Sequence, residues 1–524
     1  MQKRYQAAKA FLTDPRWKTC VFSVLAFGLL AHAYGYFGIY HSGDSLEGFY
    51  RADDLFQIGL GRFLQPVYTH LRGLVGVPWL CGLISLAWIA AALCLIADLF
   101  QVRRKSTLVL MGALLATAPM LAFCNAGYFN FTDIFMCAFF LSVLAVWLMR
   151  RFRWGFLAGA VCLVGSLGLY QSFMASACGL VTMLFILDAL DGQTGPRGLA
   201  ATASKGAGMA LLGGVLYKVC MEAALRLTGV EVSTAYNTVA YVGNYDQYSI
   251  AQLIVDTYRY VAEYLFDWLP VHPKLYALGS IVLLVLTVWA VGRLIARSRS
   301  RSPMYAVIAV AALVALPFLA NVTYFISKYM HDLMNYPLAL LPAFALVLVE
   351  RARETRKNPR DWPVWAATAG VALGLACSVI FSNTAYLRKQ VEFDSTVAAV
   401  NRIVMTMEQT DGYVVGQTPV AWVGDLSRSD AVVYRDGLGE LRGYGVSGSH
   451  RPLPHGQAFL HPGDGLSPGA GEPGRGRGAG RKRRCTGHAG IPQQGLLPGC
   501  GRDYGHPPVG MKGSNINILT NGRN

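Results

Sequence analysis

Acidic side chains gather in one stretch of this otherwise apolar chain. Asp44, Glu47, Asp53 and Asp54 occur within eleven positions, and Arg62 follows them. A carboxylate in such a stretch can act as a general base on a hydroxyl group, bind a metal ion, or cap a helix and solvate a loop. The residue types alone leave these alternatives open.

Two arginines of the same stretch, Arg62 and Arg72, could hold a phosphate or diphosphate, because a guanidinium group presents paired hydrogen-bond donors. An ion pair with the local acids explains them equally well. Other polar side chains lie between and beside them: Gln57, Gln65, Tyr68 and His70. The stretch therefore combines possible proton acceptors with possible phosphate ligands.

Other polar segments are weaker candidates that also fit ordinary interfacial turns. They contain Asn125, Tyr128, Asn130 and Asp133, then Tyr170 and Gln171, and later Lys328, His331 and Asp332. His331 could shuttle a proton, and Lys328 could compensate a phosphate charge. Lys218 and Glu222 stand at i and i+4 and are expected to pair with each other.

The elements that position these side chains are expected to be membrane-spanning helices. Of the 524 residues, 54% are hydrophobic and only 15% are charged, and the mean hydropathy is +0.37. Soluble proteins carry about 25% charged residues. The composition therefore excludes a soluble multidomain enzyme and a disordered chain, and it predicts an all-α polytopic membrane protein.

Apolar runs near the roughly 20 residues that cross a bilayer number about eleven. They lie near residues 19–40, 79–100, 107–124, 134–149, 154–170, 172–190, 206–225, 275–296, 304–326, 336–350 and 363–383. The two runs that meet around residues 165–173 fit either one kinked segment or two spans joined by a tight turn.

The lysines and arginines of the connecting segments predict the orientation. If the spans alternate, 22 of these cations fall on one side and 7 on the other. The richer side is expected to be cytoplasmic, which places the N-terminus inside and, with an odd number of spans, the C-terminus outside. Topology thus accounts for the net charge of +16, and no nucleic-acid partner is expected.

Three regions follow from this topology. Residues 1–383 form the transmembrane domain, with long outside loops at 41–78 and 226–274. Within the second loop, Ile250–Leu269 carries apolar residues at helical spacing, which predicts an amphipathic helix along the interface. Residues 384–445 join a helical pattern to the β-like runs YVVG and VAWVGD, which predicts a small outside α/β cap.

Residues 446–524 have a different composition. Between residues 451 and 510 there are 16 glycines and 9 prolines, together with the basic run RGRGAGRKRR. Such a segment cannot build a core and is expected to be disordered. Because the cap pattern stops unfinished, our hypothesis is that this tail lies outside the native reading frame.

Four short motifs carry a family resemblance. They are DSL at residues 44–46, the acid pair at 53–54, LGRF at 60–63, and RG followed by PWL within 72–80. With them the chain resembles the bacterial type II glucosyltransferases that modify O-antigen and other cell-surface glycans. The later layout is also similar, and the resemblance covers roughly residues 15–430.

The resemblance implies a GT-C-like membrane glycosyltransferase of the bacterial inner membrane. Such enzymes transfer a hexose, with glucose as the family expectation, from a polyprenyl-phosphate carrier to O-antigen or another surface glycan at the outer face. A carboxylate of the first outside loop commonly serves as the base. Carried over to this chain, that role falls to Asp44, Asp53 or Asp54.

The candidate ligands of substrate and phosphate are Arg62, Arg72, Gln57, Lys328 and His331. The expected partners are the lipid-linked sugar donor, the glycan acceptor and membrane lipids. No cofactor is evident in the sequence, and the use of a divalent metal is left open.

Two other functions compete with sugar transfer. A transporter or flippase of lipid-linked sugars would be expected to show internal repeats, or broken helices with polar residues near the membrane midplane. The sequence shows no evident repeat and gathers polar residues at one face, which favours chemistry at the surface. A glycan polymerase or ligase would share both the face and the lipid carrier.

Overall fold

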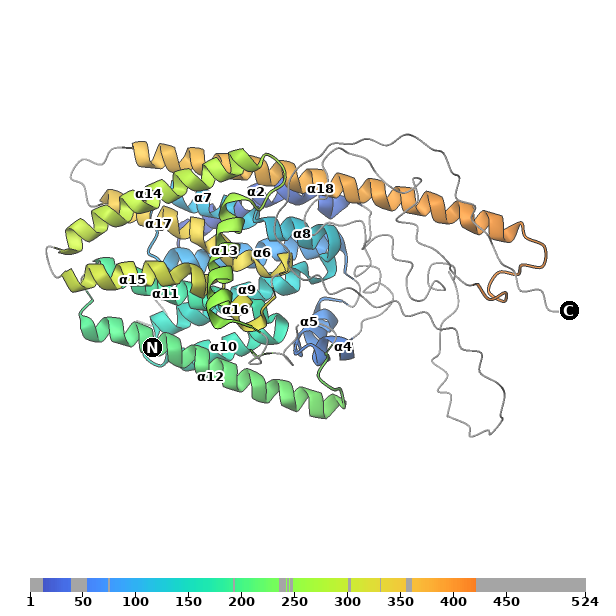
Figure 1. The fold of residues 1–524 in the computed structure, drawn as a ribbon, viewed down its shortest axis with the longest axis horizontal. Helices are drawn as coiled ribbons and strands as arrows, with labels where there is room; N and C mark the ends of the chain where they lie inside the picture. Colours follow the sequence, from blue (N-terminus) through green and yellow to red (C-terminus); the bar gives the residue numbers. More distant parts are fainter. Residues whose placement is uncertain are drawn as a thin grey trace. The chain divides into compact units, whose positions relative to one another are not determined.

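The computed structural model describes residues 13–38, 54–73, 76–191, 194–234, 242, 245, 248–299, 303–329, 331–354 and 361–420. Within these ranges the chain is mostly helical and contains no strand, which confirms the all-α prediction. The chain divides into two units: one is Met1–Val400 with Gly424–Pro452, and the other is Asn401–Val423 with Leu453–Asn524. The helical bundle in Figure 1 belongs to the first unit.

Nine helical segments of the described residues are long and apolar enough to cross a membrane. They comprise α2 (Arg16–Phe37), α6 (Pro78–Leu99), α7 (Lys105–Ala116) with α8 (Pro119–Gly127), α9 (Phe129–Arg151), η1 (Gln171–Phe173) with α11 (Met174–Asp191), α12 (Pro196–Thr228), α14 (Pro273–Arg299), α15 (Pro303–Ala320) and α18 (Trp362–Glu408). Two further predicted spans coincide with the shorter helices α10 (Gly155–Leu169) and α17 (Leu340–Glu354). The predicted spans are thus all helical.

The remaining elements are short or amphipathic. They are α4 (Asp54–Gly59), α5 (Gln65–Arg72), α13 (Ile250–Phe266), α16 (Val322–Ser327), η3 (Asp332–Met334) and η4 (Tyr336–Ala339). Helix α13 confirms the helix predicted in the second outside loop. In Figure 1 it runs across the direction of α14 and α15, and the Tyr258 hydroxyl donates to the Val314 carbonyl of α15 at 2.9 Å.

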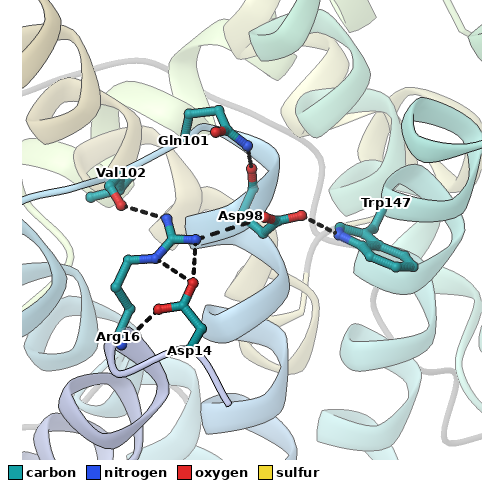
Figure 2. Close-up of polar contacts among 6 residues, drawn as sticks. All are labelled: Asp14, Arg16, Asp98, Gln101, Val102 and Trp147. Atoms are coloured by element: carbon teal, nitrogen blue, oxygen red, sulfur yellow. Dashed lines mark hydrogen bonds and ion pairs between the residues drawn. The ribbon is translucent and has the colours of Figure 1, made fainter. Parts of the chain in front are cut away.

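A polar cluster joins α2, α6 and α9 at one end of the bundle (Figure 2). Arg16 lies 2.7 Å from the carboxylate of Asp14 and donates to the Val102 carbonyl at 2.8 Å. Asp98 accepts a hydrogen bond from the indole of Trp147 at 2.8 Å and lies 3.8 Å from Arg16. Asp98 of α6 contacts both Arg16 of α2 and Trp147 of α9. One carboxylate therefore links three helices that are far apart in the sequence.

More ion pairs lie at the ends of the neighbouring helices. Arg150 of α9 makes a bidentate pair with Asp188 of α11 at 2.7–2.8 Å. Glu350 of α17 accepts hydrogen bonds from the backbone amides of Arg103 and Arg104. The three arginines belong to connecting segments that alternation assigns to the arginine-rich side, and the two acids stand at the ends of predicted spans. The contacts therefore gather that side at one end of the bundle.

The position of the Arg150–Asp188 pair shows how the two segments that meet around residues 165–173 are arranged. Helix α10 begins beside the end of α9, where Arg150 lies, and α11 ends at Asp191, near the same ion pair. Between them Tyr170 is extended, with φ −160° and ψ 116°. The two segments are therefore separate helices that run in opposite directions and meet at a tight turn.

The outside α/β cap is seen only in its helical half. Helix α18 continues from the last span to Glu408, as the helical pattern predicts. The YVVG run, residues 413–416, forms a turn in which Val414 donates its amide to the Thr418 hydroxyl at 2.9 Å. The strand expected there is thus absent, because a local turn takes up the backbone. Residues 421–445 and the tail at 446–524 lie outside the described residues.

Candidate active site

The LGRF motif forms a loop that is fixed to the turn between α10 and η1. The Leu64 amide donates to the Gly168 carbonyl at 2.9 Å, and the Gln65 side chain donates to the Leu169 carbonyl at 2.7 Å. From the other direction, the Gln171 amide donates to the Leu60 carbonyl at 2.9 Å. The loop and α5 therefore satisfy the last carbonyls of α10, and the Gln171 side chain satisfies the Leu60 carbonyl of the loop.

A residue of α12 completes this attachment. The Tyr217 hydroxyl donates to the Gly61 carbonyl at 3.0 Å and lies 3.0 Å from the amide nitrogen of Gln171. Gly61 has a φ of 82°, a left-handed conformation that favours glycine. The loop can therefore reverse direction at Gly61 and present the next residue, Arg62, to the bundle.

Arg62 lies against an aromatic ring at the centre of this end of the bundle. Its guanidinium carbon is 5.0 Å from the centroid of the Tyr170 ring, which is a cation–π contact. Its Nη1 also donates to the Gln57 side chain at 3.3 Å. The structure thus brings together two of the predicted ligands, Arg62 and Gln57, and holds the arginine in a defined position.

His331 occupies an aromatic pocket near Arg62. Its ring centroid is 5.2 Å from that of Phe123 and 6.1 Å from those of Tyr128 and Tyr329. Nδ1 accepts a hydrogen bond from the Leu333 amide at 3.2 Å, so a neutral His331 carries its proton on Nε2. Burial and the nearby charge of Arg62 lower the pKa of His331, which keeps the ring neutral at pH 7.

Lys328 is held by tyrosines of the second outside loop. Its ammonium nitrogen lies 4.5 Å from the Tyr245 ring centroid and 5.6 Å from that of Tyr248. Lys328 ends α16 in the left-handed conformation, with a φ of 58°. The residue therefore links two segments at this end of the bundle and stands three positions before His331.

Arg72 is used differently from the other predicted ligands. Its Nη1 lies 2.7 Å from the Asp133 carboxylate of α9 and donates to the Asn130 carbonyl at 2.8 Å. The Arg72 side chain is 5% exposed and that of Asp133 is 0% exposed. The pair joins α5 to α9, and its acid comes from α9 rather than from the stretch that carries Arg72.

The acids proposed as bases are only partly within the described residues. Asp44 and Asp53 lie outside them, and Asp54 is the first residue of α4, with its side chain also outside them. Helix α4 has six residues, about 9 Å at 1.5 Å per residue. The backbone of Asp54 therefore lies one short helix before the Arg62 loop.

The other predicted polar positions fall at the same end or on the surface. Tyr128 lies half-buried against His331 and Tyr170 lies buried against Arg62, whereas the amide nitrogen of the buried Asn125 is 3.5 Å from the Tyr386 hydroxyl. Lys218 and Glu222 form the expected i,i+4 pair at 4.0 Å on an exposed face of α12. Among the described residues no group of three or more His, Cys, Asp or Glu side chains could hold a metal ion.

Several residues of the site were not predicted. Tyr217 and Phe123 lie within apolar helices, where an aromatic residue looks like any lipid-facing or core side chain. Asn335 is fully buried between η3 and η4, and neither polar atom of its amide has a hydrogen-bond partner among the described residues. The only sequence signal for Asn335 is its place directly before a predicted span, two positions ahead of the proline at residue 337.

Several helices of the bundle are broken, which the sequence did not reveal. The helical segment of α7 and α8 is interrupted at Thr117 and Ala118, and α15 is separated from α16 at Asn321. The 3₁₀ turns η3 and η4 are held in the bundle by Tyr336, whose hydroxyl donates to the Leu115 carbonyl at 3.0 Å. Non-helical backbone at membrane depth is tolerated where protein buries it or where it lines a cavity.

The arrangement can hold an anionic group. Arg62 and Lys328 supply positive charge, each against aromatic rings, while the neutral His331 follows Lys328 by three positions and lies near Arg62. A phosphate group and a sugar ring both suit such surroundings, because guanidinium binds phosphate and aromatic faces pack on apolar sugar surfaces.

One comparison with known proteins found a match. A family model described as Glucosyl transferase GtrII matches residues 34–349, which include the α4–α5 loop, the α10–η1 turn and His331. No match to a curated protein or to a solved structure was found.

Proposed function

This chain belongs to the GtrII glucosyl transferase family, and from that membership we propose a donor, an acceptor and a site for its reaction. The protein is a membrane glucosyltransferase. The proposed donor is a glucosyl group linked to polyprenyl phosphate, and the proposed acceptor is a hydroxyl of O-antigen or another surface glycan. Donor and acceptor meet at the end of the bundle that holds Arg62 and His331.

The proposed reaction needs one base and one stabilised leaving group. The acceptor oxygen attacks the anomeric carbon, the bond from that carbon to the phosphate oxygen breaks, and the carrier phosphate leaves with the electron pair. A carboxylate among Asp44, Asp53 and Asp54 takes the hydroxyl proton. Arg62, supported by Lys328, is assigned to compensate the negative charge that the phosphate gains.

One observation carries this proposal: the arginine of the LGRF motif is held over Tyr170, beside a neutral histidine. The positive charge of Arg62 favours phosphate binding. Hydrogen bonds that fix its loop to Gln171 and Tyr217 limit its motion. Arg72 is engaged with Asp133, so we assign it a structural role instead of a phosphate contact.

Orientation is part of the same proposal. The arginine-rich end, with Arg16, Arg150 and Arg351, is assigned to the cytoplasm under the positive-inside rule. The Arg62 end then faces outward from a bacterial inner membrane. A sugar donor that carries no nucleotide suits that face, because the lipid anchor brings it there.

Replacement of Arg62 with glutamine is expected to lower kcat/KM for sugar transfer by about 10- to 100-fold. That range corresponds to the loss of one charged hydrogen bond, about 1.5–3 kcal/mol. Arg62→Lys should retain part of the activity, because it keeps the charge but loses the paired donors. The measurement is transfer of labelled glucose from polyprenyl phosphate in membranes.

The matched control for this variant is Arg259→Gln. Arg259 lies on an exposed face of α13, where it pairs with Glu263 at 3.1 Å. It removes the same charge and should leave transfer within twofold of the wild type. Equal activity of Arg62→Gln and Arg259→Gln would remove Arg62 from the proposed site.

Acid is expected to destabilise the protein through His331. Because the folded pKa lies below the ordinary value of 6.5, the unfolded chain binds this proton first as the pH falls below about 6.5. The free energy of unfolding therefore decreases as the pH falls below about 6.5. Above that pH, His331 has no effect on it. His331→Asn keeps an acceptor for the Leu333 amide without titrating, so its unfolding temperature should fall less between pH 7.5 and 5.5.

Thermal unfolding of purified protein at these two pH values measures the effect. A difference of about 1 °C between wild type and His331→Asn is expected, because the unfolding entropy of a chain this long is large. Identical pH dependence in the two proteins would contradict the assignment of a neutral, buried His331. Activity at pH 7.5 is recorded alongside, since a shuttle role for the imidazole would be lost in the asparagine variant at every pH.

A further inference from the structure

A polar cavity lies at the arginine-rich end of the bundle, away from the proposed active site. It has a volume of about 460 Å³ and is lined by Arg293, Ala296 and Arg297 of α14 and by Glu354 at the end of α17. The two arginines stand at i and i+4, so they share one face of α14. The proposed sugar transfer uses none of these residues.

The surroundings of the cavity place it at the level of lipid headgroups. Val285 and Val288 of α14 are 61% and 67% exposed and face outward from the bundle, as lipid-facing side chains do. Arg293 follows Val288 by five residues, about 7.5 Å along the helix. The cavity therefore begins just beyond the apolar, lipid-facing part of α14.

Tryptophan side chains lie at the same level of the bundle as the cavity. The Trp289 and Trp362 rings pack at 5.3 Å, and Trp365 on α18 is 72% exposed. Tryptophan gathers at the boundary between hydrocarbon and headgroups, where its ring is half apolar and half wet. An exposed aromatic belt next to a cationic cavity is the environment of phospholipid phosphates.

The Arg293 guanidinium is positioned to donate a hydrogen bond to a bound anion. Its guanidinium carbon lies 5.7 Å from the Trp289 ring centroid, which fixes the head of the side chain. Its Nε is buried and has no hydrogen-bond partner among the described residues. A buried N–H donor without a partner is costly, and a bound phosphate oxygen would remove that cost.

Most nearby carboxylates are already engaged with other cations or amides. Asp191 lies 3.8 Å from Arg351, and Asp361 pairs with Arg353. Glu350 accepts from the backbone amides of Arg103 and Arg104. Asp191 also lies near enough to interact with Arg297, and Glu354 is the acid of the lining itself, so the lining residues carry two cations and one carboxylate.

From these observations we propose that the cavity between α14 and α17 binds the phosphate-bearing headgroup of an anionic membrane phospholipid. The headgroup phosphate accepts from Arg293 and Arg297, and the acyl chains lie along the exposed valines of α14. Basic pockets between transmembrane helices on the arginine-rich side are suited to such lipids. The site is independent of the proposed donor and acceptor.

The test uses the full-length protein, purified in mild detergent and exposed to phosphatidylglycerol or phosphatidylcholine. Bound lipid is counted by native mass spectrometry. Arg293→Gln with Arg297→Gln is expected to lower phosphatidylglycerol retention about fivefold or more, since one cation near anionic lipid contributes a factor of that size. Glu354→Gln should raise retention, because it removes the negative charge from the lining.

The matched control is Arg151→Gln with Arg197→Gln, which removes two exposed arginines at the same end. Unchanged phosphatidylglycerol retention in this control, with loss in the cavity variant, supports the site. Equal loss in both pairs would show a general effect of charge and overturn it, as would equal retention of phosphatidylcholine by the wild type. Displacement of the lipid by millimolar inorganic phosphate would assign the cavity to the free anion and overturn the lipid.

Discussion

Sugar transfer should fall by about 10²- to 10⁴-fold when the catalytic carboxylate among Asp44, Asp53 and Asp54 is replaced with asparagine. Asparagine keeps the size of the side chain but cannot accept the hydroxyl proton. The loss is expected in kcat, with the amount of protein in the membrane unchanged. The other two replacements should have much smaller effects, because one base suffices for one proton.

Three asparagine variants run side by side measure this effect. Each is expressed as the full chain, and membranes receive labelled polyprenyl-phosphate glucose with the glycan acceptor. Asp256→Asn on α13 serves as the control, since Asp256 only accepts from Gln252 at 3.0 Å on an exposed face. Its transfer rate should match that of the wild type.

The outcomes separate the proposed chemistry from its alternatives. Loss in one variant of normal abundance identifies the base. If all three variants transfer the label at the wild-type rate, the base lies elsewhere and the carried-over role of this loop is wrong. If the wild type moves the labelled lipid across the membrane without transferring sugar, the proposed donor and acceptor are wrong. Transport of the lipid-linked sugar is then the favoured function.

The second large effect concerns the buried pair between α5 and α9. Replacement of Arg72 with methionine is expected to destabilise the protein by about 3–5 kcal/mol, because it leaves the fully buried Asp133 without its cation. The double variant Arg72→Met with Asp133→Leu should recover most of this loss, since two apolar side chains need no partner. Thermal unfolding in detergent measures both variants.

This pair of variants also decides between the two explanations of Arg72. If Arg72 is structural, the double variant regains stability and keeps much of the transfer activity. If Arg72 contacts the donor phosphate, both variants lose transfer, and the single variant unfolds at the wild-type temperature. The matched surface pair Lys218→Met with Glu222→Leu, which lies on α12, should change stability by less than 1 kcal/mol.

The partner of Arg72 shows where sequence reasoning reached its limit. The arginine was expected either to bind phosphate or to pair with acids of its own loop. Its actual partner is 61 positions away, on another helix. Hydropathy describes about 20 consecutive residues at a time, whereas this contact depends on how α5 packs against α9.

The same limit applies to Arg62 and His331. Their motifs and polar character drew attention to both, yet the aromatic surroundings that fix them come from Tyr170, Phe123 and Tyr128. An aromatic residue in an apolar span carries no mark of its neighbours in the sequence. Only the turn between α10 and η1, closed by the LGRF loop, brings Tyr170 under the arginine.

The membrane architecture itself was determined by sequence, because hydrocarbon demands runs of apolar residues that satisfy their own backbone. The family followed from short local motifs, and the match over residues 34–349 confirmed it. The tertiary structure alone decided which helices break, which charges pair, and which polar groups meet. These depend on contacts between distant segments, whose free energy arises only when the helices pack together.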